Sequence, residues 1–196
     1  MEIFDISQEV FNCTVFPGDA QPERKVLQTI EGGSICNLTA LSMCAHNGTH
    51  VDAPYHFYKD GKTIERINLN KFVGKCFVTF AEGPVSEEMA RDIVARAKQA
   101  DPEAAKRILI GGDMHVTYEA ARVFAAEKLF LVGNESQTVG PLNAPAKVHY
   151  ELLAAEVVLL EGIRLNGIAE GVYLLNAAPI NLGQSDGAPC RAILIR

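Results

Sequence analysis

From residue 84 onward, helix-like and strand-like stretches alternate along the chain, and this alternation constrains the fold more than any other feature. PVSEEMARDIVARAKQA, at residues 84–100, has a serine at a plausible helix N-cap, acidic residues in the first turn and basic residues later. Two further helix-like stretches follow, at 117–128 and 144–156. Three apolar, strand-like stretches lie between and after the helices, at 107–112, 129–134 and 157–162. Strands that alternate with helices predict an α/β fold with a partly parallel sheet.

The first half of the chain is typical of β structure. Three stretches are rich in β-branched and aromatic residues, namely 25–30, 36–45 and 75–82. Turn-forming residues separate them, and two more strands are predicted near the end, at 172–180 and 188–196. No repeat or flexible linker interrupts the 196 residues, so we predict a single domain over residues 1–196: a mixed, partly parallel sheet with helices, joined to a β-rich N-terminal part.

Charge and cysteine content exclude several classes of protein. The net charge is −6 with no basic patch, which disfavours nucleic acid and anionic membranes as partners. The apolar stretches are too short to span a bilayer, and the N-terminus lacks the features of a signal peptide. Five cysteines without a CxxC pair indicate reduced thiols, so we expect a cytoplasmic protein.

The stretch HNGTHVDAPYH, residues 46–56, holds three of the five histidines and one aspartate. In an extended segment His50 and Asp52 share one face, about 7 Å apart at the backbone. His46 reaches the same place only if the chain bends, and the Asn-Gly pair at 47–48 supplies the bend. Gly48 and Pro54 oppose a helix here. We therefore predict a bent strand or loop that gathers His46, His50, Asp52 and His56.

Imidazole and carboxylate together suit zinc, manganese or iron. A divalent ion held by three such ligands lowers the pKa of a coordinated water, and a nearby unligated histidine can shuttle protons. Two other interpretations remain open, a solvated surface loop and a structural metal without catalysis.

The motif HxGTHxDAPxH resembles the signature of the cyclase-like metal-dependent hydrolases, a family that includes bacterial kynurenine formamidase and isatin hydrolase. FPGD at 16–19 and SDGAPCRAILIR at 185–196 resemble further family motifs. His149 and Glu161 stand twelve residues apart, as do two ligands of the family. The resemblance implies a swivelling β/β/α-like fold and assembly into homodimers or homotetramers.

By this resemblance, His46, His50 and Asp52 hold one ion, and Asp52 and Glu161 bridge to a second ion held by His149. His56 is implied as the catalytic proton donor and acceptor. The ligand set fits two ions of Zn²⁺ or Mn²⁺ about equally well.

Some positions depart from the family. Phe16 stands where kynurenine formamidase has a substrate-contacting tryptophan, and it can still stack on an aryl ring. Glu135 and Thr138 replace a usual acid and serine, and GGDMH at 111–115 replaces a usual Arg-Thr pair. These loops shape the expected substrate pocket, so the substrate is less well defined than the metal chemistry. His115 could face that pocket, and Arg164 and Arg191 are weaker candidates for a substrate carboxylate.

We therefore expect a metal-dependent hydrolase that attacks a formamide or cyclic amide carbonyl with metal-bound hydroxide, similar to the arylformamidase of tryptophan catabolism. Its partner would be a small-molecule amide. The alternatives are a metal-dependent cyclase, lyase or lactone hydrolase of the same family, and a non-catalytic protein that binds metal or a small ligand.

Overall fold

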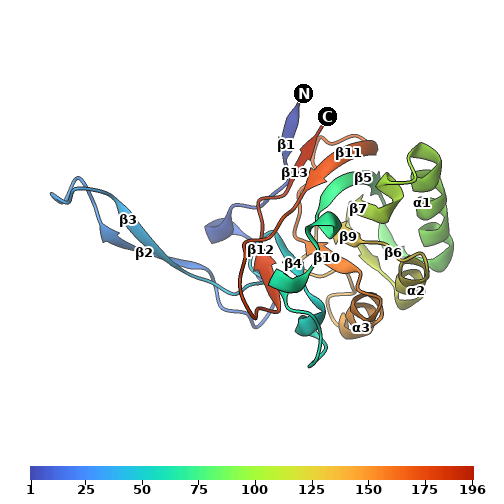
Figure 1. Cartoon of the computed structure of the whole chain (residues 1–196), viewed down its shortest axis with the longest axis horizontal. Coiled ribbons are helices and arrows are strands. Elements are labelled where there is room, and N and C mark those ends of the chain that lie inside the picture. Colours follow the sequence, from blue (N-terminus) through green and yellow to red (C-terminus); the bar gives the residue numbers. More distant parts are fainter.

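The computed structural model describes residues 1–196, and a nine-stranded sheet forms its centre (Figure 1). Strands β5, β7, β9 and β10 run parallel, and every other neighbouring pair is antiparallel. Across the sheet the order is β1 (Ile3–Asp5), β13 (Ile193–Ile195), β11 (Gly171–Asn176), β5 (Val73–Phe80), β7 (Arg107–Gly111), β9 (Leu131–Asn134), β10 (Val158–Glu161), β4 (His50–Asp52) and β12 (Gly187–Pro189). The predicted α/β fold with a mixed, partly parallel sheet is confirmed.

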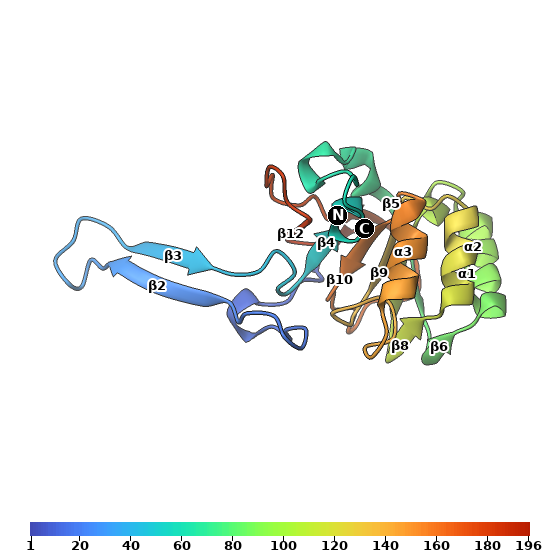
Figure 2. The same cartoon turned by 90° about the horizontal axis from the view of Figure 1, so that it is seen from below.

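Three helices lie along one face of the sheet (Figure 2), α1 (Glu87–Ala100), α2 (Tyr118–Ala126) and α3 (Ala146–Ala154). The predicted N-cap of α1 is confirmed, because the Ser86 side chain accepts a hydrogen bond from the Met89 backbone N–H at 3.2 Å. No helix combines the length and apolar character that a membrane span requires. Short 3₁₀ turns occur at Val10–Asn12, Pro54–His56, Ile64–Arg66, Leu69–Lys71 and Ala104–Lys106.

Both faces of the sheet are buried. In β7, Ile108 and Ile110 pack into the core under the helices, whereas Leu109 packs into a second core on the opposite face. Parallel strands that are covered on both faces have continuous apolar sequences rather than alternating ones. This explains the unbroken apolar stretch at residues 108–110 of β7. A separate parallel pair, β6 (Gly83–Val85) and β8 (Met114–Val116), connects the strand ends to α1 and α2.

The sheet curls. Strands β12 and β13 are separated by only three residues, 190–192, yet β12 forms one edge of the sheet and β13 lies next to the other. Three residues span at most about 10 Å, so the two ends of the sheet must approach each other. The sequence predicts one strand over 188–196, whereas the structure divides it because its two halves pair with different strands, β4 and β11.

Two of the predicted N-terminal strands leave the sheet. β2 (Glu23–Gln28) and β3 (Leu38–Ser42) form a hairpin that extends away from the body as an arm (Figures 1 and 2). No residue of either strand is buried. We call residues 23–42 the arm.

Candidate metal centre

Residues 46–56 form a bend, the short strand β4 and a 3₁₀ turn at Pro54–His56; the bend was predicted and the 3₁₀ turn was not. Gly48 has φ +68°, a conformation that glycine adopts easily. The resulting bend folds His46 back over β4, so that His46 Nδ1 lies 2.9 Å from Asp52 Oδ1. His50 Nε2 lies 3.4 Å from the same oxygen. The three side chains therefore face one point.

Strand β10 and helix α3 bring the remaining two predicted residues to this point. Glu161, the last residue of β10, pairs with His50 across the sheet, and its Oε2 lies 3.4 Å from His50 Nε2. His149 Nε2 lies 3.2 Å from Glu161 Oε1 and 3.6 Å from Asp52 Oδ2. A Cβ at Gly162 would lie 2.5 Å from the Gly48 carbonyl oxygen, so only glycine lets β10 end so close to the bend.

Backbone carbonyls orient two of the imidazoles. His50 Nδ1 lies 3.0 Å from the Gly48 carbonyl oxygen, and His149 Nδ1 lies 3.0 Å from that of Pro145. A carbonyl oxygen only accepts hydrogen bonds, so each Nδ1 carries its hydrogen and each Nε2 faces the centre. Metal-binding histidines are commonly held in this way.

The buried carboxylates give the centre its charge. Asp52 and Glu161 are only 1% and 2% exposed. Burial disfavours their ionisation, but hydrogen bonds from the surrounding histidines outweigh this effect. The pKa of Asp52 is therefore well below its usual value, and the pKa of Glu161 is also lowered.

The same contacts act on the histidines. Burial disfavours the charged imidazoles, yet hydrogen bonds to carboxylates raise the pKa of His46 to about 10 and those of His50 and His149 to about 9. The centre therefore attracts positive charge, which either protons or a cation can supply.

The donor atoms fit divalent cations. Asp52 Oδ2 is buried and has no hydrogen-bond partner, a costly state that a cation would relieve. The donor atoms of Asp52, His149 and Glu161 lie within 4.8 Å of one another, as do those of His46, His50 and Asp52. Because Oδ1 of Asp52 faces one set and Oδ2 the other, this carboxylate is suited to bridge two cations. Imidazole and carboxylate donors without thiolate suit zinc, manganese or iron.

His56 lies at the edge of the centre rather than among its buried residues. Its ring centroid is 4.0 Å from that of His46, and its Nδ1 lies 3.2 Å from Asp186 Oδ2. The same Asp186 oxygen lies 2.9 Å from His46 Nε2. Hydrogen bonds from His46 and His56 lower the pKa of Asp186 far below its usual value.

Asp186 is the residue that the sequence did not identify. It stands inside SDGAP, a stretch that resembles a family motif, but that resemblance alone assigns the aspartate no role. Its position follows from strand pairing: β12 begins one residue later and pairs with β4, where Gly187 lies opposite Asp52.

A cavity of about 220 Å³ opens onto the centre. Phe16 lines it, together with Phe57 and the buried side chains of Gln137 and Thr138. His115 lines a neighbouring cavity and not the one at the metal centre.

The two candidate arginines lie elsewhere. Arg164 donates to the backbone carbonyls of Ile163 and Glu135, and Arg191 forms an ion pair with Asp5 at 2.6 Å. Neither lines the cavity at the centre.

Comparison with known structures shows the same fold over nearly the whole chain. A structure described as a "Potential Metal-Dependent Hydrolase With Cyclase Activity" is 26% identical, with a TM-score of 0.80 over 98% of this chain and 96% of that one. A "predicted metal-dependent hydrolase from Bacillus stearothermophilus" is 25% identical, with a TM-score of 0.79 over 98% and 97%. Isatin hydrolase A from Labrenzia aggregata, at 20% identity, shares the fold with a TM-score of 0.81 over 98% and 93%.

The sequence model of the family described as "Putative cyclase" matches residues 4–141. This range contains the whole 46–56 motif and ends before His149, Glu161 and Asp186, which the fold brings to the same centre. The chain therefore belongs to the cyclase family.

Proposed function

We propose that the protein is a metal-dependent hydrolase that cleaves a small-molecule amide, either a formamide or a cyclic amide. One observation carries the proposal: a buried, unpartnered oxygen of Asp52 lies among three histidines and a second carboxylate, next to a cavity that also contains His56. Such an arrangement is costly for a protein that binds no cation there.

The residues divide into two ligand sets in this proposal. His46, His50 and Asp52 would hold one cation, and Asp52, His149 and Glu161 the second, with Zn²⁺ or Mn²⁺ as the expected metals. A divalent cation in this centre would supply Lewis acidity, which lowers the pKa of a coordinated water and polarises a carbonyl group.

His56 would move the proton. It lines the cavity, and the carboxylate of Asp186 fixes its ring through Nδ1. Nε2 is then left for the leaving nitrogen, which needs a proton when the amide bond breaks. Asp186 is a positioning residue in this scheme, because it reaches the reaction only through His46 and His56.

The walls of the cavity favour an aromatic amide. Phe16 and Phe57 present apolar rings, and a ring on the substrate can pack against them edge to face or offset. We therefore propose an activity similar to that of arylformamidase. The fold shared with isatin hydrolase, an enzyme named for a cyclic aryl amide, agrees with this choice.

The proposal is tested by elemental analysis of protein purified without chelator, together with a panel of aryl formamides, lactams and lactones. We expect bound divalent metal and turnover of an amide. His56→Ala should retain the metal and lose about 10²–10⁴-fold in kcat. Tight metal binding without turnover of any compound, and without any effect of His56→Ala, would show a binding protein instead.

A further inference from the structure

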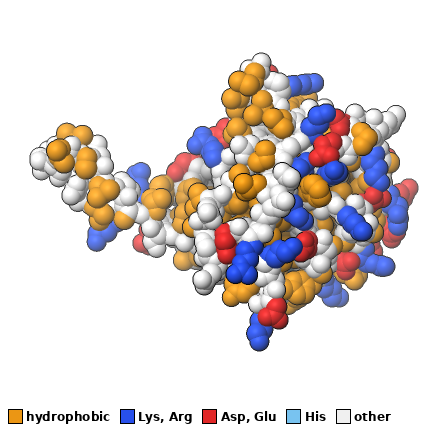
Figure 3. Space-filling view, viewed as in Figure 1, with side chains coloured by type: hydrophobic (Ala, Val, Ile, Leu, Met, Phe, Trp, Pro, Cys, Tyr) orange, Lys and Arg blue, Asp and Glu red, His pale blue; other side chains and the backbone are white.

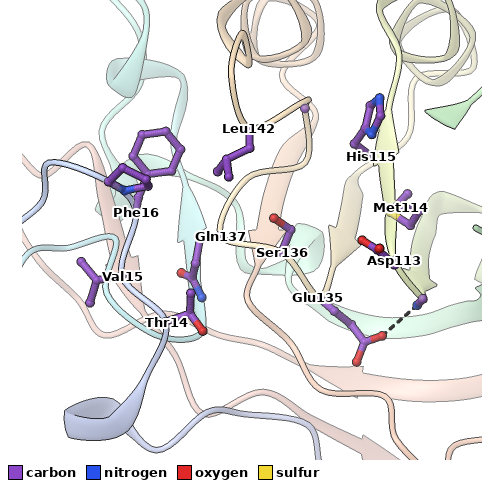
Figure 4. A pocket seen from close by; sticks show the side chains of 13 residues that line it. Thr14, Val15, Phe16, Asp113, Met114, His115, Glu135, Ser136, Gln137 and Leu142 are labelled. Carbon is purple, nitrogen blue, oxygen red and sulfur yellow. Dashed lines mark hydrogen bonds between the residues drawn. The ribbon is translucent and has the colours of Figure 1, made fainter. Parts of the chain in front are cut away.

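Residues 14–20 contribute one wall of the cavity at the metal centre, and we call them the wall loop. Phe16 and Asp19 of this loop line that cavity. Phe16 also lines a second cavity, of about 530 Å³, where the segment Thr14–Phe16 lies on one side (Figure 4). The position of the Phe16 ring therefore determines the shape of the space that is available to an aryl group beside the metal centre.

Hydrogen bonds from the body of the protein reach the wall loop only at its two ends, Thr14 and Ala20. Within the loop, the Asp19 N–H donates to the Phe16 carbonyl at 3.1 Å. After the loop the chain passes through the buried Pro22 and enters the arm, which stands clear of the body (Figure 3). The hydrogen bonds at the two ends are therefore the polar contacts that can fix the placement of Phe16.

Gln8 holds the first end of the wall loop. Its side-chain Oε1 accepts a hydrogen bond from the Thr14 N–H at 3.0 Å, and its Nε2 donates to the Gly162 carbonyl at 2.9 Å. Gly162 directly follows Glu161, one of the candidate metal ligands. One carboxamide thus connects the wall loop to the end of β10, two residues before Phe16 on the loop side and one residue after Glu161 on the other.

The local structure fixes Gln8 in this position. A Cβ at residue 162 would lie 2.5 Å from Gln8 Nε2, so glycine is needed there for the contact. Thr49 Oγ1 donates to the same Gly162 carbonyl at 2.7 Å and accepts from the Gln8 N–H at 2.9 Å. Thr49 is buried, so water does not compete for these hydrogen bonds. Gln8 is therefore held through both its backbone and its side chain.

Asn47 holds the other end of the wall loop independently. Its Nδ2 donates to the Ala20 carbonyl at 3.2 Å, and its Oδ1 accepts from the Cys44 N–H at 2.9 Å. Ala20 is four residues from Phe16, whereas Thr14 is two residues away. Loss of the Gln8 contact would therefore release the end of the loop that is nearer to Phe16 and leave the other end attached.

We propose that Gln8 is a positioning residue that fixes Phe16 beside the metal centre and so determines the affinity for the aryl part of the substrate. Gln8 does not line the cavity, so it acts only through the wall loop. The assignment rests on the proposed hydrolase function. In that function the metal centre holds the reacting carbonyl group, so a displaced Phe16 should weaken binding of the ring more than it slows cleavage of the bond.

Steady-state kinetics of metal-loaded Gln8→Met with formanilide, a minimal aryl formamide, tests the assignment. Methionine is similar to glutamine in length but cannot replace either hydrogen bond. We expect KM to rise by about 5-fold to 100-fold, as for the loss of two ordinary hydrogen bonds that hold the competent position. The value of kcat should change by less than about 3-fold, because the metal ligands and His56 are untouched.

A double-mutant cycle with Phe16→Ala shows whether Gln8 acts through Phe16. In the Phe16→Ala protein, Gln8→Met should change KM by less than about 2-fold, because the ring that Gln8 positions is gone. Gln99→Met, at an exposed position of α1, is the matched control and should leave both constants unchanged. Equal falls in kcat and kcat/KM, or the same effect with and without the Phe16 ring, would show a general structural role and overturn the assignment.

Fluorine NMR separates a failure of this assignment from a failure of the hydrolase proposal, because it needs no turnover. 4-Fluorophenylalanine placed at position 16 gives one resonance that reports the surroundings of the ring. Gln8→Met should shift or broaden this resonance, whereas Gln99→Met should not. If the resonance responds but no amide is hydrolysed, Gln8 positions Phe16 and the hydrolase proposal is wrong. An unchanged resonance would overturn the assignment, whatever the protein hydrolyses.

Discussion

Removal of divalent cations should make the stability of the protein fall as pH rises above about 6.5, the pKa of an ordinary histidine. Unfolded imidazoles lose their protons near that value, whereas the folded, metal-free centre holds them until about 9 for His50 and His149 and about 10 for His46. The folded state then binds more protons than the unfolded state. The stability that these contacts contribute is fully present below pH 6.5. It is lost as pH rises through the pKa values that the three histidines have in the folded protein.

The magnitude follows from the number of protons. Each additional proton held by the folded state changes the free energy of unfolding by about 1.4 kcal/mol per pH unit. One proton gives about 1.4 kcal/mol and three give about 4 kcal/mol. For a chain of this size 1 kcal/mol shifts Tm by about 2–4 °C, so Tm should fall by about 3–16 °C per pH unit.

Differential scanning calorimetry of chelator-treated and zinc-saturated protein, at about pH 7 and about pH 8.5, measures this effect. Cations bind the deprotonated ligands, so the zinc-saturated protein should not show the fall. Asp52→Asn removes the carboxylate that faces both His46 and His50, and should flatten the pH dependence of the metal-free form. A metal-free wild type whose Tm is constant, or higher at alkaline pH, would refute the reasoning.

Three further predictions concern single residues. Glu161→Gln keeps an oxygen that accepts from the Val139 N–H but removes a negative charge. It should weaken metal affinity by about 10-fold to 100-fold, measured by competition with a chelator. Unchanged affinity would exclude Glu161 as a ligand. Gly48→Ala places a Cβ at φ +68° and should cost about 1–2 kcal/mol, measured as a fall in Tm of about 2–8 °C; an unchanged Tm would mean that the bend tolerates alanine. Ser86→Ala removes the N-cap of α1 and should cost about 0.5–2 kcal/mol in chemical unfolding while metal content stays the same; a loss of metal would contradict a purely local role.

The sequence predicts the metal centre best for those residues that lie close together along the chain. His46, His50, Asp52 and His56 are close enough in sequence for strand geometry and one glycine to predict a shared face. His149 and Glu161 are predicted only by family resemblance, because a histidine on a helix and a glutamate before a glycine have many ordinary roles. Asp186 was missed because its position depends on the pairing of β12 with β4, a contact between distant parts of the chain.

The fold shows the same division. The helices and parallel strands after residue 84 follow from local pattern and capping. The arm does not, because the residue content that predicts a strand over 25–30 does not say whether that strand joins the sheet. The division of the last strand was also unpredictable, since it depends on how far the sheet curls.

The placement of β4 in the sheet has a consequence for the order of folding. This early strand has both of its neighbours, β10 and β12, far along the chain. Pairings between such distant segments form slowly because a long loop must first close. The parallel strands β5, β7, β9 and β10, joined by single helices, can assemble before them. The Asp52 carboxylate should therefore remain hydrated through most of refolding, and cation capture should be among the last events on the pathway.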